Sequence, residues 1–208
     1  MNFSRQRLLT PVILLLVAAG AFGWFVMQED PNRVFHDSLA ELDRGNLAAT
    51  LDGITTLETH SGYESHVALL RGGYQLQRGH PADALRSLEA IEPVGPLKEP
   101  ALELIGESLF LLDQLPLAAS QFQELLKDNP DSADSHRWLG QIFYNLGAFD
   151  TAVSHLQELI KLEPGNYLAH ALIGHMAFDF EDFQVAVENY RKALTLQRPS
   201  TIPERVHQ

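Results

Sequence analysis

Four glycines stand 34 residues apart along the chain: Gly72, Gly106, Gly140 and Gly174. Twelve residues after each glycine comes an alanine, at Ala84, Ala118, Ala152 and Ala186. Four residues beyond each alanine comes a large side chain, at Leu88, Phe122, Leu156 and Tyr190. A fixed period of this length is typical of stacked supersecondary units that complete one another's hydrophobic core. The period therefore constrains the fold more strongly than any local propensity does.

The copy that begins at Ala133 shows the pattern within one unit most clearly. A first helix is predicted from one apolar face, made of Leu139, Ile142, Phe143 and Leu146. After a turn at Gly147 and Ala148, a second helix is predicted from apolar residues spaced by three and four, namely Ala152, Val153, Leu156, Leu159 and Ile160. Pro164 then ends the unit, because proline cannot extend a helix. Each unit is thus predicted to be a helix, a turn and a second helix.

This copy resembles the tetratricopeptide repeat family. The family's Leu-Gly, aromatic, alanine, large and proline positions are matched in this chain by Leu139 and Gly140, Phe143, Ala152, Leu156 and Pro164. His136 stands where the family has its first tryptophan, with Trp138 two places later. The resemblance covers nearly all of residues 31–200 and implies an all-α fold, an α-solenoid of antiparallel helix hairpins.

The period divides the chain into repeats with defined windows. Four clear copies occupy residues 65–98, 99–132, 133–166 and 167–200, and a fainter copy occupies residues 31–64. The faint copy keeps a turn glycine at Gly45 but has Ser38 at the glycine column and Thr50 at the alanine column. A degenerate terminal repeat is what a capping unit should look like. Residues 201–208 are left as a tail.

An apolar segment precedes the repeats. Residues 8–27 contain no charge over 20 consecutive positions, which at about 1.5 Å per residue match the roughly 30 Å hydrocarbon thickness of a bilayer. Arg5 and Arg7 precede this segment and Glu29 and Asp30 follow it, so the positive-inside rule predicts a single transmembrane helix with residues 1–7 in the cytoplasm. The repeats are then expected on the exported side, with a bacterial inner membrane facing the periplasm as the favoured location. The alternative is a signal peptide cleaved near Ala19 and Ala21, which would leave a secreted or periplasmic protein.

Composition narrows the function further. The chain has no cysteine, a net charge of −12 and no cluster of Lys and Arg after the apolar segment, which argues against thiolate chemistry and against nucleic acid binding. The sequence contains no H-E-x-x-H, G-x-S-x-G, P-loop or dinucleotide fingerprint. We therefore expect no catalytic residues, no cofactor, no metal site and no enzymatic activity.

In the tetratricopeptide repeat family the first helix of each unit lines a groove that binds a peptide. The resemblance therefore implies a set of groove positions: Glu103, Glu107, Phe110, Arg137, Gln141, Tyr144, Asn145, His175, Phe178 and Asp179. The three aromatic residues would serve as anchors in the groove or would pack against the adjacent helix. Arg137, Gln141 and Asn145 share a helical face and would bind a peptide carboxylate or form a solvated stripe. His175 and Asp179 stand four residues apart and would form a metal-binding pair or, more simply, a surface pair.

These observations predict a membrane-anchored scaffold for protein–protein interaction, acting in assembly or maturation of an envelope complex. Its partner would be a protein or peptide. Two alternatives remain open at this point: a membrane-bound homo-oligomer that associates through exposed ends of the solenoid, and an accessory subunit of an enzyme complex. The last repeat favours the first alternative, because no long polar helix follows Leu194 and Leu196 to cover it.

Overall fold

The computed structural model describes residues 30–92 and 94–197. The predicted membrane segment, residues 8–27, lies outside the described residues, as do residues 1–7 and the tail 201–208. No helix among the described residues has both the length and the apolar character needed to cross a membrane. Within the described ranges the chain forms ten α-helices, one short 3-10 helix and no strand. The chain divides into two compact units, Met1–Leu70 and Arg71–Gln208.

The first unit contains α2 (Pro31–Asp43), α3 (Leu47–Leu57) and the beginning of α4 (Glu64–Gln77). Helix α2 starts where the side chain of Asp30 accepts a hydrogen bond from the backbone N–H of Asn32 at 3.0 Å. It packs against α3 at the point where Ser38 faces Gly53, and a Cβ atom added to Gly53 would lie 1.7 Å from Ser38 Oγ. In this faint copy the glycine therefore stands on the second helix, opposite the serine that occupies the glycine column.

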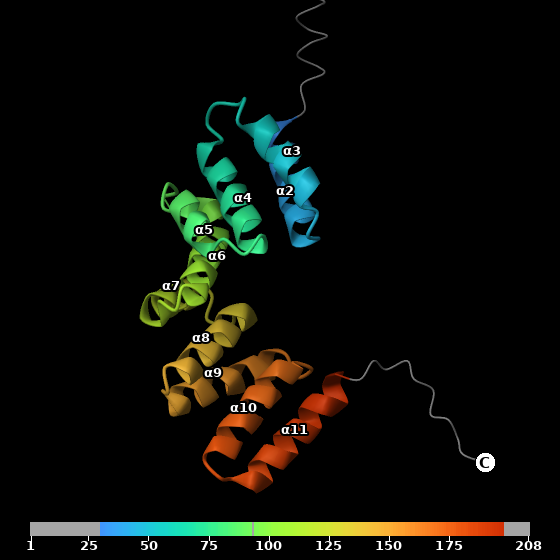
Figure 1. Cartoon of the computed structure of the whole chain (residues 1–208), viewed down its shortest axis with the longest axis vertical. Helices are drawn as coiled ribbons and strands as arrows, with labels where there is room; N and C mark the ends of the chain where they lie inside the picture. The colour runs from blue at the N-terminus through green and yellow to red at the C-terminus, as the bar shows by residue number, and fades with distance from the viewer. Residues whose placement is uncertain (1–29, 93, 198–208) are drawn as a thin grey trace, which may run out of the picture. The chain divides into compact units, whose positions relative to one another are not determined.

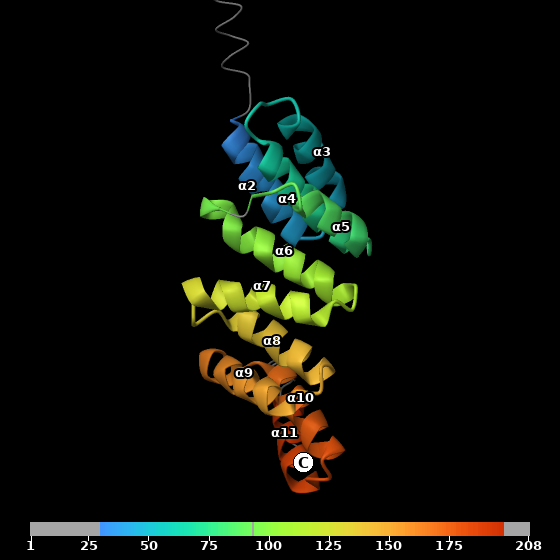
Figure 2. The ribbon, with the colours of Figure 1, turned by 90° about the vertical axis from the view of Figure 1, so that its left-hand side faces the viewer.

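The second unit contains the end of α4 and the remaining helices, which follow one another as antiparallel pairs (Figure 1). The remaining elements are α5 (Pro81–Leu88), the 3-10 helix η1 (Gly95–Leu97), α6 (Lys98–Leu111), α7 (Leu115–Asp128), α8 (Ala133–Asn145), α9 (Phe149–Leu162), α10 (Tyr167–Asp179) and α11 (Phe183–Gln197). Helices α8 and α9 confirm the two helices predicted for the copy that begins at Ala133. From α5 onward each α-helix packs on the next, and α8 also contacts α10 (Figure 2). Helices α6, α8 and α10 are thus the first helices of successive hairpins.

The starts of the first helices repeat along with the sequence. Ser132 caps α8 by accepting a hydrogen bond from Ser135 N at 3.2 Å, and Asn166, 34 residues later, caps α10 by accepting one from Ala169 N at 3.2 Å. Short polar side chains at this position satisfy backbone N–H groups that have no partner within the helix. The period in the sequence therefore sets the starts of these helices as well as their apolar faces.

The hydrophobic core of the second unit lies between the helices. The alanine column is completely or almost completely buried in all four clear copies. One core cluster joins α6, α7 and α8 through Leu109, Phe122, Leu139 and Ile142. A second joins α9 and α10 through Leu156, Leu159 and Met176. Because each core cluster uses side chains from neighbouring hairpins, the hairpins stabilise one another.

Candidate interaction surface

The ten predicted groove positions lie on three first helices of the second unit, α6, α8 and α10. We call this set the first-helix row. Phe110 of α6 meets Trp138 of α8 edge to face, with ring centroids 5.3 Å apart. Since α8 also contacts α10, the three helices present the row as neighbouring elements.

Helix α6 contributes two half-buried carboxylates, Glu103 and Glu107, which lie one helical turn apart. Burial raises the pKa of Glu103 to about 7, the charges of Glu99 and Asp134 raise it further, and Arg137 opposes the rise. Burial also raises the pKa of Glu107, again against the attraction of Arg137. Among the described residues, neither carboxylate has an ion pair within 4 Å. A partner that brought a cation to this part of the row would therefore relieve an electrostatic cost.

Arg137 on α8 is the nearest cation to these carboxylates, but it is directed elsewhere. Its Nη2 and Nε atoms donate to Asp134 Oδ1 at 2.7 and 3.2 Å. Its guanidinium also lies over the ring of Trp138, 5.0 Å from the centroid. A peptide carboxylate that approached Arg137, half-buried Gln141 and exposed Asn145 would compete with Asp134 for the guanidinium.

The aromatic members of the row differ in exposure. Phe110 is half-buried and packs against the core of α6, α7 and α8, which matches the packing alternative for this residue. Tyr144 is also half-buried, with its ring 6.0 Å from that of Phe149. Phe178 is 55% exposed and meets Phe183 at 5.7 Å. Exposure therefore increases toward the C-terminal end of the row.

The structure adds aromatic side chains that the sequence reasoning missed. Phe180, in the turn between α10 and α11, is 63% exposed and meets Phe149 edge-on at 5.0 Å. Together with the neighbouring rings it forms an aromatic cluster of five residues: Tyr144, Phe149, Phe178, Phe180 and Phe183. The sequence carried one usable signal, because Phe149 and Phe183 stand 34 residues apart at the start of successive second helices. Exposed aromatic groups of this kind are typical of interaction surfaces.

His175 and Asp179 both contact the neighbourhood of Tyr190 rather than forming a chelating pair. The Tyr190 hydroxyl lies 2.9 Å from His175 Nδ1, and the two rings meet edge to face at 5.2 Å. Burial, followed by the charge of Asp179, raises the pKa of Tyr190. Across residues 30–92 and 94–197, no group of three or more His, Cys, Asp or Glu residues is arranged to hold a metal ion.

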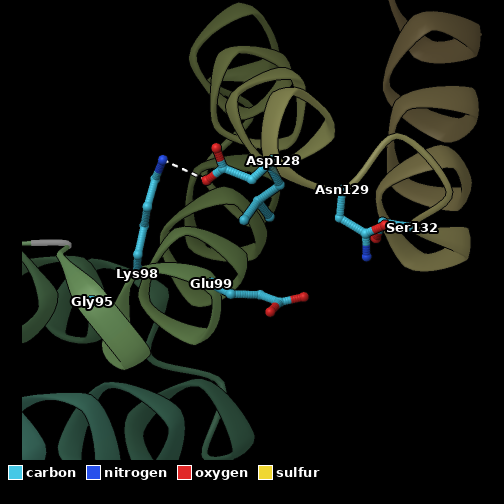
Figure 3. Close-up of a pocket in the computed structure, with 7 residues that line it drawn as sticks. Gly95, Lys98, Glu99, Asp128, Asn129 and Ser132 are labelled. Atoms are coloured by element: carbon cyan, nitrogen blue, oxygen red, sulfur yellow. Dashed lines mark hydrogen bonds and ion pairs between the residues drawn. The ribbon is translucent and has the colours of Figure 1, made fainter.

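A polar hollow of about 160 Å³ lies outside the row, at the start of α6, the end of α7 and the start of α8 (Figure 3). Figure 3 shows Lys98 directed at Asp128, and the Nζ–Oδ2 distance is 2.6 Å. The hydrogen bond with Asp128 raises the pKa of Lys98, and Glu124 Oε1 lies 3.5 Å from the same Nζ. The volume is below the roughly 300–1,000 Å³ of typical small-molecule sites. Because its one cation is neutralised by two carboxylates, the hollow has no charge left to attract an anion.

Comparison with known families gives an independent reading of the repeats. A family model described as tetratricopeptide repeat matches residues 104–167 and residues 145–201. Both ranges fall on the stacked hairpins of the second unit. This part of the chain carries tetratricopeptide repeats. The first-helix row, apart from Glu103, lies inside the matched residues.

Solved structures with the same arrangement extend the likeness beyond the residues that the family model matches. MamA from Desulfovibrio magneticus RS-1, from residue 41 to its end, superposes with a TM-score of 0.70 at 19% identity and covers 84% of this chain and 99% of that one. A double mutant described as MamA RS-1 ArsTM gives a TM-score of 0.68 at 20% identity, with 82% and 97% covered. A further crystal structure of MamA gives 0.64 at 21% identity, with 77% and 94% covered. At these identities the likeness establishes the fold, an all-helical solenoid of tetratricopeptide type. No curated protein sequence matches the chain.

Proposed function

We propose that this chain is a scaffold for protein–protein interaction that binds a partner segment along the first-helix row. The observation that carries the proposal is the pair Glu103 and Glu107, half-buried carboxylates with no ion pair among the described residues, while Arg137 is held by Asp134. A partner with Lys or Arg side chains would supply the missing cation. Apolar side chains of the same segment would cover the aromatic cluster, where Phe178 and Phe180 are largely exposed.

The proposal includes a place in the cell. Residues 8–27 would anchor the chain in a membrane as a single span, with residues 1–7 in the cytoplasm and the repeat windows 31–64, 65–98, 99–132, 133–166 and 167–200 on the exported side. The uninterrupted apolar run and the arginines before it support this arrangement. Such a tether would raise the effective concentration of a weak binding surface near its partners. A role in assembly or maturation of an envelope complex, carried out by recognition and without enzymatic activity, completes the proposal.

The location of the binding surface is tested by photo-crosslinking in the full-length chain. A photoreactive phenylalanine at position 178 would be activated in native membranes, and the same group at Gln157, exposed on α9, would serve as the control. We expect a defined covalent product with another protein from position 178 and none from position 157. Equal products from both positions, or none from either, would overturn the proposed surface.

The charge preference is tested on the partner that the crosslink captures. Glu103→Gln with Glu107→Gln should weaken binding about tenfold, the equivalent of about 1.4 kcal/mol. Glu89→Gln removes the same charge from an exposed position outside the row and should leave the affinity unchanged. If the double variant and the control bind equally well, the acidic part of the row does not select the partner.

A further inference from the structure

The outer face of the last helix is exposed where equivalent faces in the chain are covered. Three columns with a period of 34 define this face on each second helix: Leu115, Ala119 and Leu126 on α7, Phe149, Val153 and Ile160 on α9, and Phe183, Val187 and Leu194 on α11. On α7 and α9 these side chains are buried or half-buried in core clusters. On α11 they are 56%, 55% and 63% exposed. We call these three residues the α11 face.

The covered faces show what kind of element fits this one. Helix α7 carries α8, the first helix of the next hairpin, and α9 carries α10. The covering helices contribute small or apolar residues at i, i+4 and i+7, for example Ala169, Ile173 and Met176 of α10. Residues 198–208, which follow α11, do not repeat this pattern, since prolines stand at positions 199 and 203. The α11 face is therefore a seat for a helix that this segment does not supply.

We propose that the α11 face pairs with the α11 face of a second copy of this chain, helix against helix and antiparallel. Phe183 and Leu194 lie at equal distances along the helix from the midpoint between Glu188 and Asn189. An antiparallel pair centred there places Phe183 of one protomer against Leu194 of its partner, with the two Val187 side chains near the axis. The same apolar set therefore serves both sides of a two-fold contact.

The charges beside the α11 face fit this pairing. Glu188 forms an ion pair with Lys192 in the same helix, at 2.9 Å. Arg191 has no ion pair among the described residues. In the antiparallel pair, Arg191 of one protomer comes within two residues of the level of Glu188 in its partner. Opposite charges therefore flank the apolar contact across the two-fold axis, where like charges would oppose it.

The other end of the array does not fit the α11 face. In α2 the residues equivalent to Ser135, Leu139 and Ile142 of α8 are Arg33, Asp37 and Ala40. Arg33 Nε and Asp37 Oδ2 form an exposed ion pair at 3.4 Å. Stacking α2 of another copy on the α11 face would bury this pair against apolar side chains, which is costly. Pairing through α11 alone gives a closed dimer, because an isologous contact uses the same patch on both copies.

The absence of cysteine from the chain makes a direct test available. In the full-length protein, Val187→Cys should form a disulfide-linked dimer under mild oxidation at least tenfold faster than Gln157→Cys, an exposed control on α9. Equal rates would overturn the pairing. A mixed disulfide between position 187 and another polypeptide in native membranes would assign the face to a different protein. Protection of the thiol introduced at position 187 from maleimide in a monomer would assign the face to residues 198–208. Either result would overturn self-pairing.

Charge substitutions test the same contact without crosslinking. Val187→Glu or Leu194→Glu should reduce the dimer fraction in light scattering at least tenfold, with helical content unchanged by circular dichroism. Leu117→Glu changes a leucine that is 54% exposed on α7, outside the face, and should leave the dimer intact. Dimers that persist in both α11 variants would overturn the proposal. Neither residue belongs to the first-helix row or the aromatic cluster, so this inference can fail while the proposed partner binding stands.

Discussion

Gly106 lies directly beneath the ring of Phe122: a Cβ atom added to the glycine would lie 2.6 Å from Cε2 of the ring. The other three copies repeat this relationship between each column glycine and the large residue 16 positions later. The pairs are Gly72 with Leu88, Gly140 with Leu156 and Gly174 with Tyr190. The glycine column thus leaves the volume that the large side chain of the second helix fills. This explains why leucine, phenylalanine and tyrosine alternate at one position while the glycine does not change.

Replacing Gly106 with alanine is expected to destabilise the second unit. Phe122 is buried, so its ring cannot move aside, and overpacking of this kind costs about 1–3 kcal/mol. The gain in helix propensity returns up to about 1 kcal/mol. Urea denaturation should therefore show a net loss in the free energy of unfolding of about 1–2 kcal/mol. Gly165→Ala is the control, because a Cβ atom there meets nothing within 4 Å. Equal stability of the two variants would contradict the packing account.

The turn after each first helix contains one residue with positive φ, again at a period of 34. Glycine occupies three of these positions, Gly45, Gly79 and Gly147, but Asp113 has φ 58° and Glu181 has φ 61°. A side chain in this region of backbone space costs about 1–2 kcal/mol. Glu181→Gly should therefore raise the free energy of unfolding by up to about 1 kcal/mol, after the greater freedom of glycine in the unfolded chain is allowed for. The reciprocal change Gly147→Ala should lower it by about 1 kcal/mol. Thermal or urea unfolding measures both, and shifts of the same sign would refute the explanation.

A pair of histidines in the third clear copy is expected to make stability depend on pH. His136 Nε2 lies 3.0 Å from the carbonyl oxygen of Pro130, so this nitrogen carries the proton, and His136 Nδ1 accepts from His155 Nδ1 at 3.0 Å. Burial lowers the pKa of His155, as does the nearby His136, while Glu158 opposes the shift. The unfolded chain therefore binds more protons than the folded one as the pH falls below about 6.5, and stability is lost toward the lowered pKa.

The variant His155→Asn tests this dependence and has a natural precedent in the next copy. There Asn189 stands at the equivalent position, and its Oδ1 lies 3.1 Å from His170 Nδ1. We expect His155→Asn to lose less stability than the parent chain between pH 7 and pH 5, measured by urea unfolding. His80→Asn, at an exposed position, should behave as the parent does. If the slope is the same in all three proteins, His155 does not cause the dependence.

Glu103 is expected to act in the opposite direction. Its pKa is raised to about 7 in the folded chain by burial and by the neighbouring carboxylates, so between about pH 4.5 and 7 the folded state binds more protons than the unfolded one. Stability is then lost as the pH rises through this range. Glu103→Gln should remove that loss, so that the variant gains on the parent between pH 5 and pH 8. The same measurement on Glu89→Gln provides the baseline, and a parallel gain there would show that the effect does not arise in the first-helix row.

The repeating elements could be predicted from the sequence. The period of 34 and the apolar spacing around Leu139 and Leu156 indicated a first and a second helix, and α8 and α9 lie where they were expected. These features follow from local rules, because helical periodicity, turn glycine and proline act within a few residues of one another. The interaction surface was accessible only in part. The row positions followed from the family resemblance, while Phe149, Phe180 and Phe183 were missed because they approach one another only after the hairpins stack.

The sequence by itself determined that this chain builds helix hairpins, and in which register. Only the tertiary structure decided what each equivalent position does. Phe149 and Phe183 occupy the same place in successive copies, but the first is half-buried beside α10 and the second is exposed on the last helix. In the same way Phe110 packs against Trp138, whereas Phe178, two copies later, remains exposed. The physical reason is that burial in a solenoid depends on the neighbouring hairpin, so identical local patterns acquire different environments according to what packs on them.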